Sequence, residues 1–507
     1  MPVSNQPYSV QELRRGAWHF LSGRAASAFL SFGTLLVVVR LLPIAEYGAY
    51  MTFVAWLEFI VAISGLGLPW LAARYIPDYR LHANGAEVVA VIRHLLLWMF
   101  AALAAVVVVS ALLMDYYLEG AGLAVYRSAA LIYLLAALLE GVARQTIEGV
   151  LNPLMRQVAV RSSLVARQVV FLSLIAVIWY FGAIGLQQVV VSELVASAVG
   201  ASIALSAVWR YGRAVRSKLG VPGWVAPAPM AMWRTALNMY VVQLVSILYS
   251  PQFLVLVVQR MMGSEAAAIF GFLRGLYGQV ARLLPATLLF SLVRPKLVAS
   301  YVGGRGVQDL ANNANLMGKL SLVPLIPIIA FAPVGGEALV GLLSGGKFPG
   351  TGLLFFGLMI SLLPYSQRLL AETVAVASGQ SDICTVASLT GFAMPPLMLW
   401  LVHLGFGLWV PILILGIGHL AVNAVILNEM RRRTGYAVDF RGAMKLALAL
   451  PFAYLAAWAV PLSGRAVQDV SAALLCSVLM FLIAAWLLRP FSVAELGVLR
   501  RMLSGKG

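Results

Sequence analysis

The stretch HFLSGRAASAFLSFGTLLVVV, from His19 to Val39, is long and apolar enough to cross a bilayer, although Arg24 lies inside it. On a helix, Ser27, Ser31 and Thr34 fall within about 80° of Arg24, so these polar side chains form one stripe. The stripe is expected to face the protein interior while the other faces contact lipid. We therefore interpret this stretch as a first membrane span, retained rather than cleaved as a signal peptide.

The composition is that of an all-α integral membrane protein. Of 507 residues, 62% are hydrophobic and 11% are charged, and the mean hydropathy is +0.91, whereas soluble domains carry about 25% charged residues. Apolar runs of near-bilayer length recur along the chain and predict about 14 transmembrane helices. Cys384 and Cys476 offer neither a disulfide framework nor a Cys-rich metal site, and no cofactor is expected.

The net charge of +17 reflects membrane topology rather than nucleic-acid binding, because the basic residues are scattered among short loops. With the N-terminus inside, 27 Lys and Arg fall on the inner side, 5 on the outer side and 4 within spans, which accounts for all 36. Cytoplasmic loops collect positive charge, so both termini and the connection from Trp209 to Arg234 are predicted to be cytoplasmic.

That longer connection separates the first six predicted spans from the rest, and the chain is predicted to have four parts. Residues 1–208 are predicted to form an N-terminal six-helix lobe, 209–236 a cytoplasmic linker, 237–430 a C-terminal six-helix lobe, and 431–507 two further transmembrane helices with an amphipathic tail. In the tail, Ser492 and Glu495 are spaced as a capping box. Four prolines inside spans are expected to mark bends: Pro285, Pro324, Pro327 and Pro364.

The two halves contain a weak repeat. VVVRLLPIAEYGAY, from Val37, and LVVQRMMGSEAAAIF, from Leu256, each combine a helix end, an Arg and a Glu that opens the next helix, and Glu46 and Glu265 are 219 positions apart. An even number of spans separates the two motifs, so the halves share one orientation. The same offset carries the polar trio of the first span onto the seventh span, from Arg24, Ser27 and Ser31 to Gln243, Ser246 and Ser250.

The eighth predicted span carries Arg274 and Arg282, eight residues apart and therefore on one face of the helix. An arginine inside a span costs about 2.5 to 3.5 kcal/mol and marks a functional site by default. Two other interpretations stay open. Arg24 could be an anchor that snorkels to the inner boundary, about 9 Å away at 1.5 Å per residue, and the eighth-span arginines could form structural ion pairs.

Acidic residues inside spans supply partners for some arginines. Glu140 and Arg144, and likewise Arg368 and Glu372, are four residues apart, a spacing that favours local pairing. Glu58 has no partner at that spacing and is a candidate for a bond to one of the lone arginines or for an ion-coupling site. Several membrane-embedded arginines indicate an anionic substrate, and a phosphate-bearing lipid fits the planar guanidinium.

The segment VVVRLLPIAEYGAYMTF, followed by GLGLPWLAARYIPDY, resembles the start of bacterial polysaccharide exporters of the O-antigen flippase type. Their superfamily also holds lipid II flippases and multidrug and toxin extruders. The resemblance implies two six-helix lobes around a central cavity and alternating access. The implied substrate is an undecaprenyl-pyrophosphate-linked oligosaccharide, moved from the inner to the outer leaflet of the bacterial cytoplasmic membrane for lipopolysaccharide or exopolysaccharide assembly.

The resemblance also assigns site residues and partners. Arg24 matches a first-helix cavity arginine, and either Arg274 or Arg282 matches an eighth-helix one. The implied partners are the lipid-linked glycan, membrane lipids and the polysaccharide polymerase machinery. Motifs of the lipid II flippases themselves are not evident, which favours an oligosaccharide carrier.

Two other functions compete with flipping. A membrane glycosyltransferase or polymerase would need carboxylates or histidines gathered on a substantial loop, and the outer loops are short and poor in both. A drug and cation antiporter would favour acidic or aromatic residues in its cavity. A cavity lined by arginine and hydroxyls would indicate the flippase, and one lined by lone carboxylates the antiporter.

Overall fold

The computed structural model describes residues 10–288, 306–378, 380–461, 466–492 and 495–497, with the backbone alone for a few of them, Arg24 included. Within this part of the chain every regular element is a helix, so the predicted all-α class is confirmed. The chain forms two compact units. Unit 1 comprises Met1–Ile247 and Val255–Ala268, and unit 2 comprises Leu248–Leu254 and Ile269–Gly507.

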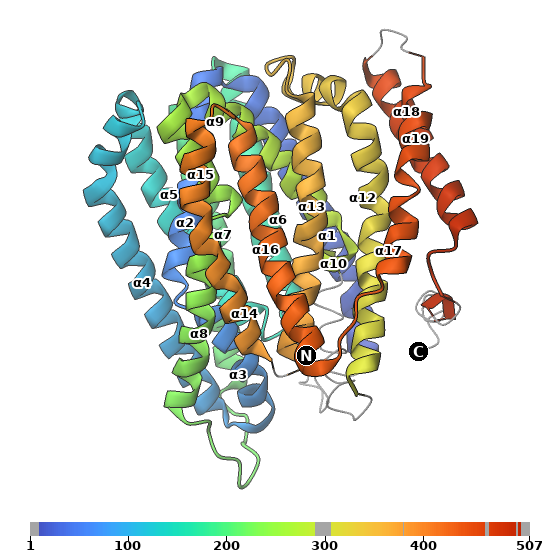
Figure 1. The fold of residues 1–507 in the computed structure, drawn as a ribbon. Helices are drawn as coiled ribbons and strands as arrows, with labels where there is room; N and C mark the ends of the chain where they lie inside the picture. Colours follow the sequence, from blue (N-terminus) through green and yellow to red (C-terminus); the bar gives the residue numbers. More distant parts are fainter. Residues whose placement is uncertain (1–9, 289–305, 379, 462–465, 493–494, 498–507) are drawn as a thin grey trace. The chain divides into compact units, whose positions relative to one another are not determined.

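In unit 1 the long helices lie side by side along a common direction (Figure 1). Its helices are α1 (Val10–Leu41), α2 (Ile44–Ser64), α3 (Leu68–His82), α4 (Gly85–Gly120), the short η1 (Ala124–Tyr126), α5 (Arg127–Thr146), the single π-turn η2 (Ile147–Leu151), α6 (Gln157–Phe181), α7 (Leu186–Val215) and α8 (Pro229–Ile247).

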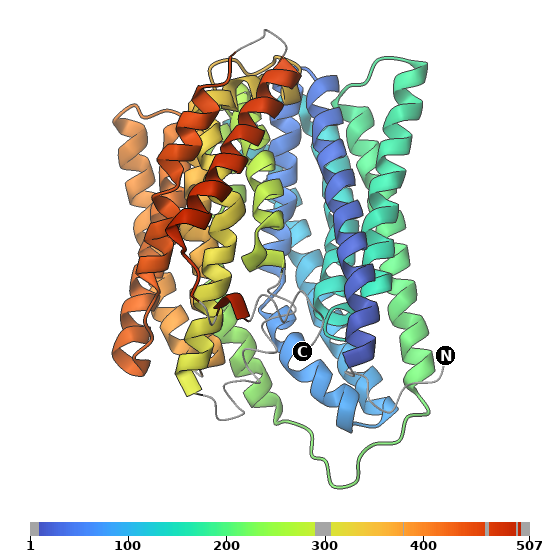
Figure 2. The ribbon, with the colours of Figure 1, turned by 90° about the vertical axis from the view of Figure 1, so that its right-hand side faces the viewer.

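Helix α9 (Pro251–Leu283) contributes segments to both units. The remaining helices belong to unit 2: α10 (Pro285–Leu288), α12 (Gly306–Ser344), α13 (Gly352–Ala377), α14 (Ser381–Ser388), η4 (Leu389–Ala393), α15 (Met394–His403), α16 (Trp409–Thr434), α17 (Phe440–Ala447), α18 (Leu450–Trp458) and α19 (Ala466–Leu488). Helices α17, α18 and α19 pack together and against α12 (Figure 2).

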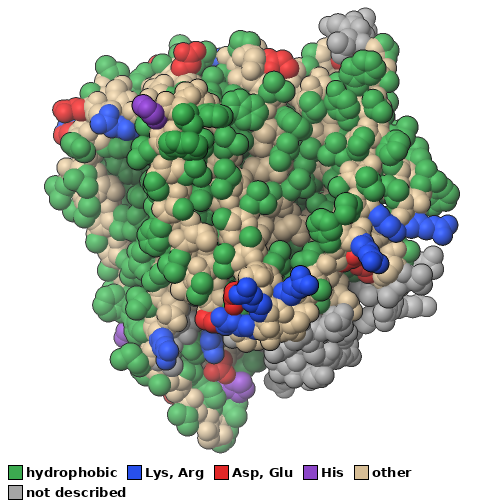
Figure 3. All heavy atoms as spheres, in the orientation of Figure 1, with side chains coloured by type: hydrophobic (Ala, Val, Ile, Leu, Met, Phe, Trp, Pro, Cys, Tyr) green, Lys and Arg blue, Asp and Glu red, His purple; other side chains and the backbone are tan. Residues whose placement is uncertain are grey.

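The described chain has the helices needed for a multi-pass membrane protein. Twelve stretches are long and apolar enough to span a membrane; one of them, Met232–Leu283, covers two predicted spans, and Ala25–Leu41 is a shorter apolar helix. The predicted number of 14 is therefore approximate. Figure 3 shows hydrophobic side chains along the helices of the visible face, with Lys and Arg near the helix ends. Such an apolar surface suits lipid.

Local sequence explains where several helices begin and end. Asn84 begins α4 with a capping box, because its side chain accepts from the Glu87 amide while Glu87 accepts from the Asn84 amide. Gly435 ends α16 with φ +71°, a left-handed conformation that glycine adopts at no steric cost.

The part of the chain that holds the seventh and eighth predicted spans departs from regular helix at three points. Helix α8 ends at Ile247 and α9 begins at Pro251. Within α9, Gly263 has φ +85° and kinks the helix, which a residue with a Cβ would resist. Helix α9 ends before Pro285, where α10 starts, so the expected interruption at Pro285 is confirmed. Bends at the other three prolines stay predictions, since α12 and α13 run through them as continuous helices.

Two predicted span boundaries need correction. The apolar run from Tyr47 to Leu71 predicts one continuous second span, but α2 ends at Ser64 and a separate helix, α3, starts at Leu68 after Gly67, whose φ is +68°. The apolar run from Leu316 to Phe331 predicts a short ninth span, whereas α12 is 39 residues long. Both errors arise because apolar content marks the membrane-embedded part of a helix and carries little information about where the helix ends.

Candidate functional site

Thr34, at one end of the polar stripe of α1, contacts α6. The Thr34 hydroxyl oxygen lies 2.7 Å from Gln168 Oε1 and 3.0 Å from the Leu30 carbonyl oxygen, and its single hydrogen can be donated to either. One turn before Ser27, Gly23 lies so close to α6 that an added Cβ would be 2.9 Å from Arg161 Cγ. The expectation that this stripe faces the protein interior is therefore confirmed at Thr34. The side chain of Arg24 lies outside the described part of the chain.

A network of buried charges connects α5, α6 and α7 in unit 1. Arg167, on α6, places Nε 2.8 Å from Glu140 Oε2, and its Nη2 also contacts Glu193 Oε1 on α7. Arg144 Nε lies 2.8 Å from the other oxygen of Glu140, so the predicted pairing of Glu140 and Arg144 is confirmed. The side chains of Glu140 and Glu193 are only 3% and 7% exposed, and a buried charge is tolerable only when it is paired in this way.

The π-turn η2 follows directly after this network. The Asn152 amide donates to the carbonyl of Ile147, five residues back, at 2.8 Å. Such turns are rare and are frequent at functional sites. The turn also carries Glu148, four residues after Arg144, whose side chain interacts electrostatically with Arg144.

Unit 2 has its own buried polar cluster. Arg368 Nε lies 2.6 Å from Glu372 Oε1, which confirms the second predicted pair. Arg368 Nη1 donates to Tyr249 Oη at 2.5 Å and lies 3.4 Å from His419 Nδ1. Gly418 makes room for the Tyr249 ring, because a Cβ at Gly418 would lie 2.6 Å from that ring. The cluster thus anchors the Leu248–Ser250 turn to α13 and α16.

Arg274 and Arg282 are both on α9 in unit 2, as their spacing predicted. Arg274 is half-buried and Arg282 is exposed. Arg282 interacts electrostatically with Tyr365 on α13, whose ring lies 6.1 Å from that of Tyr277 and 5.3 Å from that of His419. The rings of Tyr277, Tyr365 and His419 therefore form a row that runs from α9 to the Arg368 cluster.

The residues expected opposite the first-helix stripe have local structural contacts. Gln243 Nε2 donates to the Ala62 carbonyl at 2.9 Å, and this carbonyl belongs to the last turn of α2, where helix acceptors have no intrahelical partner. Ser250 is the N-cap of α9 and accepts from the Phe253 amide at 3.4 Å. Ser246 is half-buried on α8. Glu58 is half-buried on α2.

Sequence reasoning missed two of the most deeply embedded charges. The count of 27 inner-side Lys and Arg includes Arg167 as a helix-end residue, although it lies ten residues into α6. No pairing pattern in the sequence pointed to Glu193. Helical spacing offered a signal, because Glu193 follows Ser192 and precedes Ala196 and Ser197 on a face of small residues, a face that packs closely against another helix. Among the described residues, no group of three or more His, Cys, Asp and Glu could hold a metal ion.

Comparison with solved structures defines the class of the fold. The chain is similar to a lipid II flippase MurJ in an inward closed conformation, with a TM-score of 0.62 and 13% identity over 92% of this chain and 97% of that one. It is also similar to an inward-facing multidrug resistance MATE family transporter of the MOP superfamily, with a TM-score of 0.57 and 16% identity over 81% and 94% of the two chains. The chain therefore shares the fold of these two solved structures.

The sequence also matches a protein family directly. Residues 13–292, more than half of the chain, match the family described as polysaccharide biosynthesis protein, and the chain belongs to this family. The predicted resemblance to polysaccharide exporters is thereby confirmed. A search of curated proteins gave no significant match.

Proposed function

We propose that the protein is a flippase that moves an undecaprenyl-pyrophosphate-linked oligosaccharide from the inner to the outer leaflet of a bacterial cytoplasmic membrane. Transport would proceed by alternating access and would serve surface or exopolysaccharide assembly. The family supports a role in polysaccharide biosynthesis, and the fold supports movement of a substrate through a membrane. The glycan, the leaflets and the direction are part of the proposal.

The observation that carries the proposal is the way charges are distributed inside the helices. Glu140, Glu193 and Glu372 are each in contact with an arginine. These carboxylates are therefore committed to ion pairs, which argues against their holding an organic cation. Arg274 and Arg282 also lie on a membrane-embedded helix, α9, and a guanidinium can bind two phosphate oxygens at once.

Within this proposal the pyrophosphate is bound by Arg24 and by at least one of Arg274 and Arg282. Hydroxyls and amides of Ser27, Ser31, Gln243, Ser246 and Ser250 would bond sugar hydroxyls. Binding must be strong enough to offset desolvation of the headgroup and weak enough to permit release. Hydroxyl and amide groups suit that need, because each forms a modest hydrogen bond and none fixes a single register.

The source of energy is a separate part of the proposal. Glu58, half-buried on α2, is the candidate for ion coupling. The polysaccharide polymerase machinery is the proposed downstream partner, since it would consume the flipped product.

A cation-coupled antiporter is the second candidate function, favoured by the similarity to the MATE family transporter. The arginine pairing of the buried carboxylates weighs against it. Fluorescent organic cations provide a direct comparison: extrusion that depends on this protein would favour the antiporter.

Deletion of the gene tests the proposed function. The deletion strain is expected to accumulate the lipid-linked oligosaccharide in the inner leaflet of its cytoplasmic membrane, and a plasmid copy should reverse this. Normal glycan export by the deletion strain, or accumulation in the outer leaflet, would contradict the proposal.

A further inference from the structure

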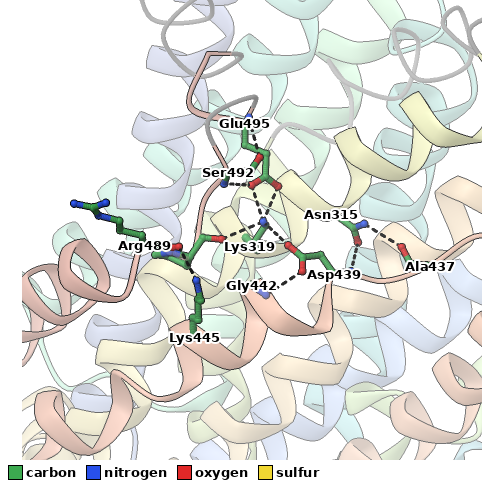
Figure 4. Close-up of polar contacts among 10 residues, drawn as sticks. Asn315, Lys319, Ala437, Asp439, Gly442, Lys445, Arg489, Ser492 and Glu495 are labelled. Atoms are coloured by element: carbon green, nitrogen blue, oxygen red, sulfur yellow. Dashed lines mark hydrogen bonds and ion pairs between the residues drawn. The ribbon is translucent and has the colours of Figure 1, made fainter.

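Lys319 lies on α12 with only 3% of its side chain exposed. Its Nζ is 2.7 Å from Asp439 Oδ2, 2.6 Å from Glu495 Oε1 and 3.3 Å from the Pro490 carbonyl oxygen (Figure 4). An ammonium group has three donors and no acceptor. All three donors of Lys319 therefore have acceptors, and two of these acceptors are carboxylates.

The acceptors come from the two ends of one structural element. Helices α17 and α18 together form one candidate membrane span, Phe440–Trp458, and α19 forms the next. We call these two spans, which comprise helices α17, α18 and α19, the C-terminal helical pair. Asp439 precedes α17 and caps it by accepting from the Gly442 amide at 3.0 Å. Pro490 and Glu495 follow α19. One side chain on α12 therefore holds the chain immediately before and immediately after the pair.

Neighbouring contacts support the same attachment. Asn315 Nδ2 donates to the Ala437 carbonyl at 3.1 Å, and Asn315 Oδ1 accepts from the Asp439 amide at 3.1 Å. Glu495 also forms a capping box with Ser492, as its spacing predicted, so the carboxylate is held in place by its own backbone turn. The clamp of Lys319, Asp439 and Glu495 is thus preorganised from both sides.

Apolar packing continues the contact along α12. Leu322, Ile326 and Ala330 of α12 belong to one buried cluster with residues of the pair, including Phe481. Further along, the Ser477 hydroxyl on α19 donates to the Pro327 carbonyl at 3.0 Å. That carbonyl lies in a proline-containing stretch of α12, where the backbone lacks some of its intrahelical donors.

Electrostatics favour a closed clamp at neutral pH. Burial raises the pKa of Asp439, but the hydrogen bonds from Lys319 and from the Gly442 amide outweigh it and hold that pKa below its usual value. Asp439 therefore stays charged. Loss of the ammonium would leave two carboxylates close together without their shared cation, and removal of one partner from such a group is strongly unfavourable.

We propose that Lys319 is a permanent pin, which fixes the C-terminal helical pair and the segment after α19 on α12 so that they move as one body whenever unit 2 changes conformation. The pair would then act as a fixed extension of α12 rather than as a latch that opens during transport. The comparison of resting and energised vesicles rests on the proposed transport function, whereas the protease comparison of wild type with the Lys319 variants does not.

Cleavage after Glu495 by a Glu-specific protease tests the pin on the full-length protein. In the wild type, Glu495 is 13% exposed and held by Lys319, so cleavage should be slow. Lys319→Met should speed cleavage at least tenfold. The matched control is Lys445→Met, because Lys445 lies near the same segment and gives a single bond to the Arg489 carbonyl at 3.3 Å; its cleavage should stay within twofold of wild type.

Equal cleavage of wild type and Lys319→Met would overturn the pin. If Lys319→Met does not accumulate, Lys319→Gln, which retains a donor but no charge, provides the same comparison and the same decision. No substrate is needed for this readout, so it decides the pin even if the protein carries no glycan.

A second measurement separates a pin from a latch. Wild-type cleavage after Glu495 should differ by less than twofold between resting and energised vesicles that are supplied with the transported lipid. A tenfold increase in the energised vesicles would show that the clamp opens and would overturn the proposal.

Discussion

Arg167 Nε lies 2.8 Å from Glu140 Oε2, which joins α6 to α5 by an ion pair in the interior of unit 1. Glu193 contacts the same guanidinium from α7. One arginine thus connects three membrane-embedded helices and neutralises two carboxylates that would otherwise be costly to bury. We regard this network as the structural centre of unit 1, while the arginines proposed to bind substrate lie on α1 and α9.

Replacement of Arg167 should destabilise the protein strongly. Arg167→Met leaves Glu140 and Glu193 buried without their shared cation, and we expect a loss of about 3 to 5 kcal/mol. The measurement is the thermal unfolding midpoint of the purified protein in detergent. Arg432→Met is the control, because the side chain of Arg432 is 69% exposed in its ion pair with Glu429 and such pairs contribute about 0 to 1 kcal/mol. Equal midpoints for the two variants would contradict the network's role.

A close contact between α2 and α9 in unit 1 leads to a second prediction. A Cβ added to Gly48 on α2 would overlap the backbone carbonyl of Ser264, whereas nothing lies within 4 Å of a Cβ added to Gly33 on α1. Gly→Ala in a helix is otherwise favourable by about 1 kcal/mol. Gly48→Ala should therefore lower the unfolding midpoint, and Gly33→Ala should leave it unchanged or raise it. A higher unfolding midpoint for Gly48→Ala than for Gly33→Ala would show that α2 and the part of α9 around Ser264 can move apart at little cost in free energy.

Topology can be tested independently of transport. Both termini and the connection from Trp209 to Arg234 should be cytoplasmic, because 27 of the 36 Lys and Arg then fall on the inner side. Fusions of a reporter that is active only outside the cytoplasm should be inactive at the C-terminus and at this connection. An active C-terminal fusion would require an odd number of spans.

Much of the fold could be predicted because a membrane-spanning helix requires a long run of apolar residues, which is visible in the sequence. The pairs Glu140 with Arg144 and Arg368 with Glu372 were also predictable, since both partners lie on one helix at a fixed spacing. The Ser492 and Glu495 capping box was accessible for the same reason. In each case the relevant contact is local in sequence.

Contacts between distant helices could not be derived in this way. Arg167 and Glu193 are 26 residues apart on two helices, and Lys319 is separated from Glu495 by 176 positions. Their pairing depends on which helix faces which, and apolar composition is nearly the same on all faces of these helices. Gln243 illustrates a different difficulty, because its amide serves the end of α2 and a sequence pattern cannot distinguish that role from substrate binding.

The role of Arg24 is the part of the proposal that a single substitution addresses best. Arg24→Ala removes the proposed phosphate contact, and Arg24→Lys keeps the charge but loses the bidentate geometry. We expect Arg24→Ala to slow transport at least tenfold and Arg24→Lys to have an intermediate effect. Arg93→Ala is the control, because Arg93 is an exposed residue of α4 and is expected only to anchor topology.

The most direct measurement uses purified protein in vesicles that contain a pyrophosphate-linked oligosaccharide lipid. A glycosidase added outside reports the oligosaccharide that has crossed, under an imposed ion gradient or membrane potential. The account predicts rapid, protein-dependent transfer that Arg24→Ala slows at least tenfold and Arg93→Ala leaves within twofold of wild type. Transfer by the wild type no faster than in protein-free vesicles, or full activity of Arg24→Ala, would contradict it.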